Sequence, residues 1–420
     1  MTQVLSSPPV LPELLAPVGS FEKLVTAVHY GADAVYLGGK AFSLRARAGN
    51  FDELGLRHAI SYAHDHGVKV YVTVNIFAHN RDMDELGPYL IMLNDAKADG
   101  IIVSDPGILS LAHQLVPDLS LHLSTQANVT NDASARFWAG QGVGRLNLAR
   151  ELGLEEIKSI REATGAELEV FVHGALCISY SGRCMLSNYF TGRNANQGDC
   201  AHPCRYSYAV VEEKRPGQYF PVEEDDRGTY IFNAKDLCLL PHLPLLVDAG
   251  VNAIKIEGRM KSAGYVGAVV RLYRQALNWI GEQIFLGKPA VSLRLPEIFH
   301  NELSKIGTRG QTENFFSTRP SSEDMLYDTM RIEQSWVPVG IVRQAEPLLI
   351  ETRQVLNCGD RVEYLGRGID PDQVTVAVMK LEDGTQIERA NPGNRVLLQT
   401  EPPLKQIELH ALLRKRNQPS

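Results

Sequence analysis

Short apolar runs alternate with longer segments of helical period from Pro12 onward. The runs are rich in Val, Ile and Leu, as strands are, and the longer segments repeat their apolar positions with the period of a helix. Such an alternation predicts parallel strands joined by helices. The predicted strands are the eight segments Leu14–Pro17, Ala34–Gly38, Lys69–Asn75, Gly100–Ser104, Leu119–Thr125, Arg145–Ala149, Glu167–His173 and Ala253–Glu257.

The helices predicted between and after these strands include Ser20–Tyr30, Asp52–His66, Asp82–Ala96, Asp132–Gln141, Leu154–Ala163 and Ala263–Ile280. Eight strand–helix units over residues 12–280 are what a TIM-type (β/α)8 barrel requires, and an open doubly wound sheet is the alternative. In either fold, chemistry occurs at the carboxyl ends of the strands. These ends are polar here, with Asn75, Ser104, Asp105, Ser124, Thr125, Gln126, Arg150, Glu151, His173, Lys255, Glu257 and Arg259.

The seventh unit departs from the pattern, because about 80 residues separate His173 from Ala253. Within this cysteine-rich insertion, residues 174–250, four of the six cysteines of the chain lie close together in sequence, at Cys177, Cys184, Cys200 and Cys204. Its polar cysteine segment cannot build a packed core, and thiolates are preferred ligands of zinc and of clustered iron. The insertion leaves the barrel at the rim where chemistry is expected. We therefore predict a metal centre near the barrel mouth.

A [4Fe–4S] cluster is the centre that this spacing favours, and two alternatives stay open. Zinc sites usually place paired cysteines about two to four residues apart, and only Cys200 and Cys204 are spaced in this way. Disulfides between these cysteines are the second alternative. They are uncommon in reducing cytosol, and the opening residues MTQVLSSPPVLPE do not resemble an export signal. The sequence therefore predicts a cytoplasmic protein.

The remaining segments predict a second, smaller domain. Residues 1–11 are expected to form a disordered lead-in, and residues 281–334 a helical extension and linker. Between residues 335 and 410, short strands alternate with turns, which predicts a small β-barrel. Residues 411–420 contain Arg414, Lys415 and Arg416 and are interpreted as a solvated basic tail, with an RNA-binding patch as the alternative.

Composition narrows the class of protein. Hydrophobic residues make up 44% and charged residues 22%, which are ordinary values for a soluble protein. No apolar run approaches the roughly 20 residues of a membrane helix, so no membrane partner is expected. The net charge of −7 argues against non-specific coating of nucleic acid, which needs an excess of Lys and Arg. Local basic surface is still compatible with binding a folded RNA.

Five arginines are candidates for substrate binding: Arg45, Arg47, Arg150, Arg183 and Arg259. The guanidinium group suits a substrate with carboxylates, because it binds a carboxylate through two parallel hydrogen bonds. The alternative for each arginine alone is a surface ion pair.

His173 and Glu257 are the candidates for proton transfer, since histidine titrates near neutrality and burial tunes a rim carboxylate. The alternative for His173 is a hydrogen-bonded histidine that orients the cysteine segment. Lys255 and Glu257 lie two residues apart on one strand, so an interior structural ion pair is the alternative for them. For a peptidase, the chain lacks both a G-x-S-x-G and an H-E-x-x-H motif.

The sequence resembles one family over nearly its whole length, the proteins labelled peptidase family U-thirty-two or collagenase-like proteases. The resemblance is carried by ELLAPVGSFEKL, YGADAVYLGG, FSLRARAGNF, SDPG, HLSTQANVTN, EVFVHGALCISYSGRCMLS, NQGDCAHPCRY, NAKDLC and IKIEGRMKS. Within the family, the chain is most similar to the branch that takes part in prephenate-dependent, oxygen-independent 5-hydroxylation of the wobble uridine of tRNA.

The resemblance implies an iron–sulfur enzyme of RNA modification, with tRNA as partner, prephenate or a derived molecule as co-substrate, and an unidentified electron donor. It places the cluster ligands on Cys177, Cys184, Cys200 and Cys204, with Cys238 as the possible replacement for Cys204. A buried thiol is the ordinary interpretation of Cys238 and of Cys358. The alternatives are hydroxylation of ribosomal RNA or of a quinone precursor, peptide hydrolysis, and a non-enzymatic RNA-binding scaffold with a structural metal.

Overall fold

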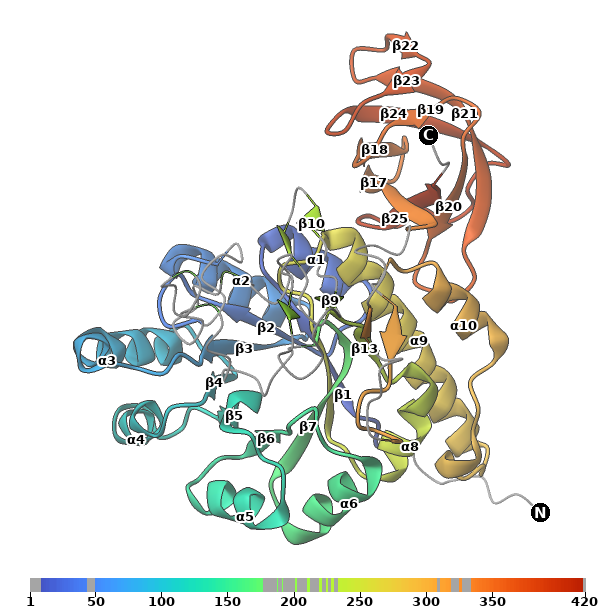
Figure 1. The fold of residues 1–420 in the computed structure, drawn as a ribbon. Coiled ribbons are helices and arrows are strands. Elements are labelled where there is room, and N and C mark those ends of the chain that lie inside the picture. Colours follow the sequence, from blue (N-terminus) through green and yellow to red (C-terminus); the bar gives the residue numbers. More distant parts are fainter. Residues whose placement is uncertain are drawn as a thin grey trace.

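The structure is a computed structural model. It describes residues 9–43, 50–176, 187, 191, 201, 210–211, 219–220, 224–225, 228–229, 233–307, 310–318, 325–326 and 334–417. Figure 1 shows two bodies, a barrel surrounded by helices and a β-domain at the carboxyl-terminal end of the chain.

Eight parallel strands form the barrel, in the order β1, β2, β3, β4, β5, β6, β7 and β14. Strand β14 pairs with both β7 and β1, which closes the sheet. The barrel prediction is therefore confirmed, and the open-sheet alternative is wrong. The strands are β1 (Glu13–Pro17), β2 (Ala34–Gly38), β3 (Lys69–Val74), β4 (Gly100–Val103), β5 (Leu121–Leu123), β6 (Arg145–Asn147), β7 (Glu167–Gly174) and β14 (Ala253–Ile256).

The helices pack around the outside of the barrel (Figure 1). They are α1 (Phe21–His29), α2 (Glu53–Asp65), α3 (Asn80–Asp95), α4 (Pro106–Leu115), α5 (Asp132–Gly140), α6 (Leu154–Ala163), α8 (Leu243–Asp248) and α9 (Ala263–Phe285). Several begin at a Ser, Asp or Asn whose side chain accepts a backbone N–H of the first turn, as Ser20 and Asp52 do. No helix in the described part of the chain is long and apolar enough to cross a membrane.

The cysteine-rich insertion begins and ends side by side at the barrel. It leaves after β7 and returns through β13 (Asp236–Cys238), which pairs antiparallel with the end of β7. Strand β15 (Gln311–Thr312) then pairs with β13. The other short strands here are β8 (Val210–Val211), β9 (Tyr219–Phe220), β10 (Glu224–Asp225), β11 (Gly228–Thr229), β12 (Asn233–Ala234) and β16 (Met325–Leu326).

The C-terminal domain is an antiparallel β-barrel with its own core, as predicted. Its closed sheet runs β20, β25, β17, β18, β24, β21 and back to β20, and it encloses residues such as Val339, Ile350 and Met379. The strands are β17 (Trp336–Gln344), β18 (Leu349–Thr352), β19 (Leu356–Asn357), β20 (Arg361–Leu365), β21 (Asp372–Leu381), β22 (Gln386–Ile387), β23 (Arg389–Ala390), β24 (Arg395–Glu401) and β25 (Leu412–Arg416).

The prediction of a solvated basic tail at residues 411–420 is wrong for residues 411–417, the part of it that the structure describes. Strand β25 lies between β17 and β20 in the sheet. Leu412 and Leu413 enter the core, and Arg414 is only 5% exposed. The Arg414 guanidinium bonds Glu302 at 2.7 Å and Glu363 at 2.8 Å. These remote carboxylates compensate the buried charge, so the segment can complete a barrel.

The two domains share a buried ionic interface. Helix α10 (Glu297–Ser304) supplies Glu302, which also accepts a hydrogen bond of 2.8 Å from Arg271 of α9. Lys305 reaches Glu363 of β20 at 2.8 Å. At the end of α1, the Tyr30 hydroxyl donates to the carbonyl of Leu365 and accepts from the backbone N–H of Leu412. Buried contacts of this kind hold the β-domain in one orientation against α1, α9 and α10.

Candidate active site at the barrel mouth

The carboxyl ends of β3, β4 and β5 form a polar floor. The side-chain amide of Asn75 donates to Gln126 Oε1 at 2.8 Å, and the Ser124 hydroxyl donates to the same oxygen at 3.0 Å. The Ser104 hydroxyl donates to the backbone carbonyl of Asn75 at 3.0 Å. Gln126 lies in the short 3-10 helix η1 (Thr125–Ala127), which directly follows β5. The strand-end residues predicted from sequence therefore meet at one rim.

Arg259 is held at the same rim between the ends of β2 and β3. Its guanidinium donates to Ser43 Oγ at 3.0 Å and to Thr73 Oγ1 at 3.2 Å. A third hydrogen bond of 2.5 Å goes to Asn50 Oδ1. These three hydrogen bonds fix the position of the guanidinium at the rim. Gly38 is required here because a Cβ on it would lie 2.5 Å from Arg259 Nη2.

Glu257 and Arg150 border the mouth on the side where the insertion leaves. Glu257 follows β14, and its carboxylate accepts a 3.3 Å hydrogen bond from the Tyr36 hydroxyl. Arg150 follows β6 and donates to the carbonyl of Ala175 at 2.7 Å, and its guanidinium lies 4.3 Å from the centre of the Phe171 ring. Arg150 thus fixes the first residues of the insertion. Burial raises the pKa of the neighbouring Glu151 carboxyl.

His173 is turned away from the barrel interior. The register between β7 and β14 shifts just before His173, so Phe171 faces Lys255 whereas His173 pairs with Ile256. The ring is fully buried against Tyr265 and Tyr273 of α9, and Nδ1 lies 3.3 Å from the Tyr273 hydroxyl. Burial lowers the pKa of His173 to about 4. This geometry favours the alternative of a histidine that orients the start of the insertion.

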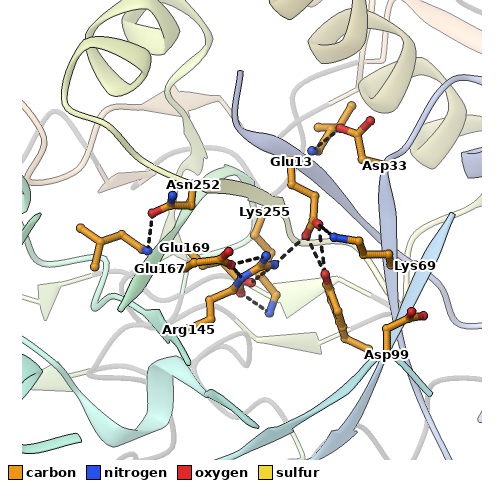
Figure 2. Close-up of polar contacts among 12 residues, drawn as sticks. Glu13, Asp33, Lys69, Asp99, Arg145, Glu167, Glu169, Asn252 and Lys255 are labelled. Atoms are coloured by element: carbon orange, nitrogen blue, oxygen red, sulfur yellow. Dashed lines mark hydrogen bonds and ion pairs between the residues drawn. The ribbon is translucent and has the colours of Figure 1, made fainter. Parts of the chain in front are cut away.

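Lys255 belongs to an ionic cluster inside the barrel, below the mouth. Its ammonium group lies 2.8 Å from Glu169 Oε1, so its ion-pair partner is Glu169 and the predicted Lys255–Glu257 pair is wrong. Figure 2 shows how the cluster continues through Arg145, which lies 3.7 Å from Glu169 and 2.6 Å from Glu13. Lys69 and Tyr71 also bond Glu13. Buried charges of both signs compensate one another, which identifies this cluster as structural.

The four predicted cluster cysteines, Cys177, Cys184, Cys200 and Cys204, lie outside the described residues, as do Arg45, Arg47 and Arg183. One described contact bears on the cysteine segment. The backbone N–H of Ala201 donates to Ser187 Oγ at 2.9 Å, and both residues are buried. Ser187 follows Cys184 by three residues and Ala201 directly follows Cys200. This hydrogen bond therefore joins two residues that lie close in sequence to different cysteines.

Cys238 lies within the core, on the face of β13 toward α9. It is 4% exposed and has no disulfide partner, and it pairs with His173 across the two strands. Burial raises the pKa of the Cys238 thiol to about 11. A catalytic cysteine needs the opposite, a lowered pKa beside a charged histidine. Cys238 and His173 therefore do not form a peptidase dyad, and no group of three or more His, Cys, Asp or Glu within the described ranges could hold a metal.

Sequence patterns alone did not identify all the partners of these side chains. Ser43 and Asn50 flank the phrase that contains Arg45 and Arg47, but nothing in that phrase shows that they bond Arg259. Tyr273, the partner of His173, is 100 residues away on α9. Asn147 ends β6 at the level of Ser124 and carries no sequence signal beyond its place at a strand end.

Comparison with known proteins gives one family for most of the chain. The family described as "Peptidase family U32" matches residues 19–326, and its C-terminal domain family matches residues 334–414. The chain is 37% identical over 383 residues to the "tRNA hydroxylation protein P1" of Bacillus subtilis (strain 168), covering 90% of this chain and 89% of the relative.

Two further relatives carry different descriptions. A protein of Methanocaldococcus jannaschii described as "Uncharacterized protease MJ0090" is 37% identical over 400 residues, which cover 92% of this chain and 94% of the relative. The "23S rRNA 5-hydroxycytidine C2501 synthase" of Escherichia coli (strain K12) is 36% identical over 307 residues, which cover 73% of this chain and 45% of the relative.

Proposed function

The chain belongs to peptidase family U32, and from that premise we propose that it is an RNA-modifying hydroxylase that acts on tRNA. The observation that carries the proposal is the 37% identity to a tRNA hydroxylation protein over about nine-tenths of both chains. A second relative is described as an rRNA 5-hydroxycytidine synthase, which supports hydroxylation of an RNA base as the type of reaction. A polar barrel mouth at the carboxyl ends of the strands offers the place for such a reaction.

The proposed product is 5-hydroxyuridine at the wobble position. In an oxygen-independent reaction with water as the oxygen source, replacing the C5–H of the base with C5–OH releases two protons and two electrons, so the enzyme needs an electron acceptor as well as the co-substrate. We propose prephenate, or a molecule derived from it, as the co-substrate of an oxygen-independent reaction. Arg259 is the candidate for binding a dicarboxylate of this kind, because a guanidinium binds carboxylates through parallel hydrogen bonds and Ser43 and Thr73 fix this one at the rim.

A [4Fe–4S] cluster is the proposed cofactor, and Cys177, Cys184, Cys200 and Cys204 would hold it. Four thiols are a soft donor set that suits clustered iron, and the Ser187–Ala201 hydrogen bond joins a residue close to Cys184 in sequence with the residue after Cys200. When bound, the cluster would supply electron transfer at the barrel mouth. His173 and Arg150 fix the residues where the insertion leaves β7 and would in this way help to position the cluster. Glu257 remains the proposed proton-transfer group, oriented by Tyr36.

Nucleoside mass spectrometry tests the function directly. We expect tRNA from a strain that lacks the gene to lose 5-hydroxyuridine and nucleosides derived from it, and a plasmid copy to restore them. Ribosomal RNA from the same cells is the second arm, because one relative modifies rRNA. Unchanged tRNA together with lost 5-hydroxycytidine in rRNA would contradict the tRNA assignment, and no change in either RNA would contradict the hydroxylase.

A further inference from the structure

The floor of the barrel mouth contains an amide group whose hydrogen-bonding capacity is only half used. Gln126 is 1% exposed, and its Oε1 accepts from both Asn75 and Ser124. Those two bonds fix the orientation of the amide, so Nε2 must point away from Asn75 and Ser124. Among the described residues, the buried Nε2 has no hydrogen-bond partner. An unsatisfied buried donor is costly, which makes it a marker for a missing ligand.

A second unsatisfied group lies on the next strand, in register with Ser124. Asn147, the last residue of β6, is 2% exposed, and its buried Oδ1 has no partner within the described part of the chain. Leu123 of β5 pairs with Leu146 of β6, so Ser124 and Asn147 occupy the next register position. The Thr125 hydroxyl also bonds the carbonyl of Leu148 at 3.1 Å, which ties η1 to the end of β6.

Resting on the proposed function, we propose that Gln126 and Asn147 read the Watson–Crick edge of the target base and select uracil. Uracil presents a carbonyl oxygen at position 4 next to an N–H at position 3. The Gln126 amide would donate to the first and Asn147 Oδ1 would accept from the second. Both side chains are almost wholly buried, so a base that contacts them is withdrawn from water, as in enzymes that flip a base into a pocket.

The same pair of groups disfavours cytosine. Cytosine carries an amino group at position 4 and an unprotonated nitrogen at position 3, so its donor and acceptor are exchanged relative to uracil. The Gln126 donor would then face the amino donor of cytosine, and the Asn147 acceptor would face the acceptor at position 3. A mismatched contact of this kind changes base preference on the order of 10- to 100-fold. Contact at position 4 also holds the adjacent C5, the atom to be hydroxylated, at the floor of the mouth.

Gln126→Glu is the sharpest test of this assignment. Glutamate keeps an oxygen for the bonds from Asn75 and Ser124 but replaces the Nε2 donor with an acceptor, which suits the amino group of cytosine. We expect binding of an anticodon stem-loop with uridine at the target position to weaken by at least about tenfold relative to one with cytidine. Affinity for a stem-loop with an abasic target position should stay within about twofold.

The design includes a control and a second variant. Gln114→Glu makes the same change on the exposed surface of α4 and should bind all three stem-loops like the wild type. Asn147→Ala adds no charge and should also reduce the preference for uridine, so the test holds even if the glutamate variant unfolds. If both folded variants keep the wild-type ratio of uridine to cytidine binding, the assignment is wrong, and internal waters satisfy the two amides.

Failure of the proposed function gives a different result. Nucleoside mass spectrometry of tRNA from the deletion strain carrying the wild-type gene shows whether uridine is hydroxylated at all. If the wild type restores 5-hydroxyuridine and Gln126→Glu restores it equally, only the base-reading assignment fails. If the wild type restores nothing and binds none of the stem-loops, the tRNA function itself fails, and with it the assignment that rests on it.

Discussion

Single buried side chains decide several features of this protein, and Lys255 is the clearest case. Strand periodicity correctly predicts that it points into the barrel, but not which charge it meets. Its partner is Glu169 on the neighbouring strand β7, at 2.8 Å. A bulge explains a second difference, because the register shift after Phe171 turns His173 outward although simple alternation would direct it inward.

Breaking the Lys255–Glu169 pair should destabilise the fold. We expect Lys255→Met to lower the free energy of unfolding by about 3 kcal/mol, because it leaves a carboxylate without its close partner inside the barrel. Urea denaturation followed by circular dichroism measures the change. Adding Glu169→Leu should recover most of the loss, since the pair is then replaced by apolar groups. A double variant as unstable as the sum of both single variants would contradict this interpretation.

Stability should also fall in mild acid because of His173. Its folded-state pKa of about 4 lies below the unfolded value of 6.5. The neutral ring therefore contributes stability that is complete above pH 6.5 and is lost as the pH falls from 6.5 toward 4. Thermal unfolding between pH 7.5 and 4.5 should show a shallower slope for His173→Asn than for the wild type. Gln114→Asn, a change of an exposed residue that does not titrate, should leave the slope unaltered.

At the scale of elements, the strands of the barrel could be predicted to within two residues, because each is a short apolar run between polar ends. The last strand of the β-domain could not be predicted from the sequence. Residues 411–416 contain two leucines followed by three basic residues, which locally is the pattern of a tail. Only the fold brings Glu302 and Glu363 to Arg414, and nothing near residue 414 in the sequence indicates them.

Strand β25 should therefore be essential to its domain. Deleting residues 411–420 removes a strand from between β17 and β20 and exposes the core, so we expect insoluble protein or a large loss of β-domain stability. Deleting only residues 418–420 is the matched control and should leave the thermal unfolding midpoint within about 1 °C. Limited proteolysis reports on the β-domain itself. Equal protease resistance of the two truncated proteins would show that β25 is dispensable.

On the scale of the whole molecule, the chain combines a barrel, an insertion that leaves after β7 and returns through β13, and a β-domain packed against α1, α9 and α10. The sequence predicted the barrel, the insertion and the β-domain, because each has its own repeating pattern. The ligand set remains a prediction from the cysteine spacing and the family resemblance. Cys238 was an alternative ligand, and its burial with a raised pKa instead suits the ordinary interpretation of a core thiol.

Iron content tests whether Cys204 or Cys238 is the fourth ligand of the cluster. Protein purified without oxygen should hold about four irons per chain. We expect Cys204→Ser to lose most of its iron and Cys238→Ser to keep it, since the Cys238 thiol packs in the core. Iron loss from Cys238→Ser with retention in Cys204→Ser would reverse the assignment. Stoichiometric zinc in colourless wild-type protein would rule out the cluster.

The central claim is that this U32 protein hydroxylates uridine in tRNA through its cysteine-bound cluster. The most direct measurement is nucleoside mass spectrometry of tRNA from a deletion strain that carries either the wild-type gene or Cys177→Ser at equal protein level. We predict that 5-hydroxyuridine and its derivatives return with the wild type and stay absent with the variant. Full restoration by Cys177→Ser, or undiminished 5-hydroxyuridine in the deletion strain itself, would contradict the account.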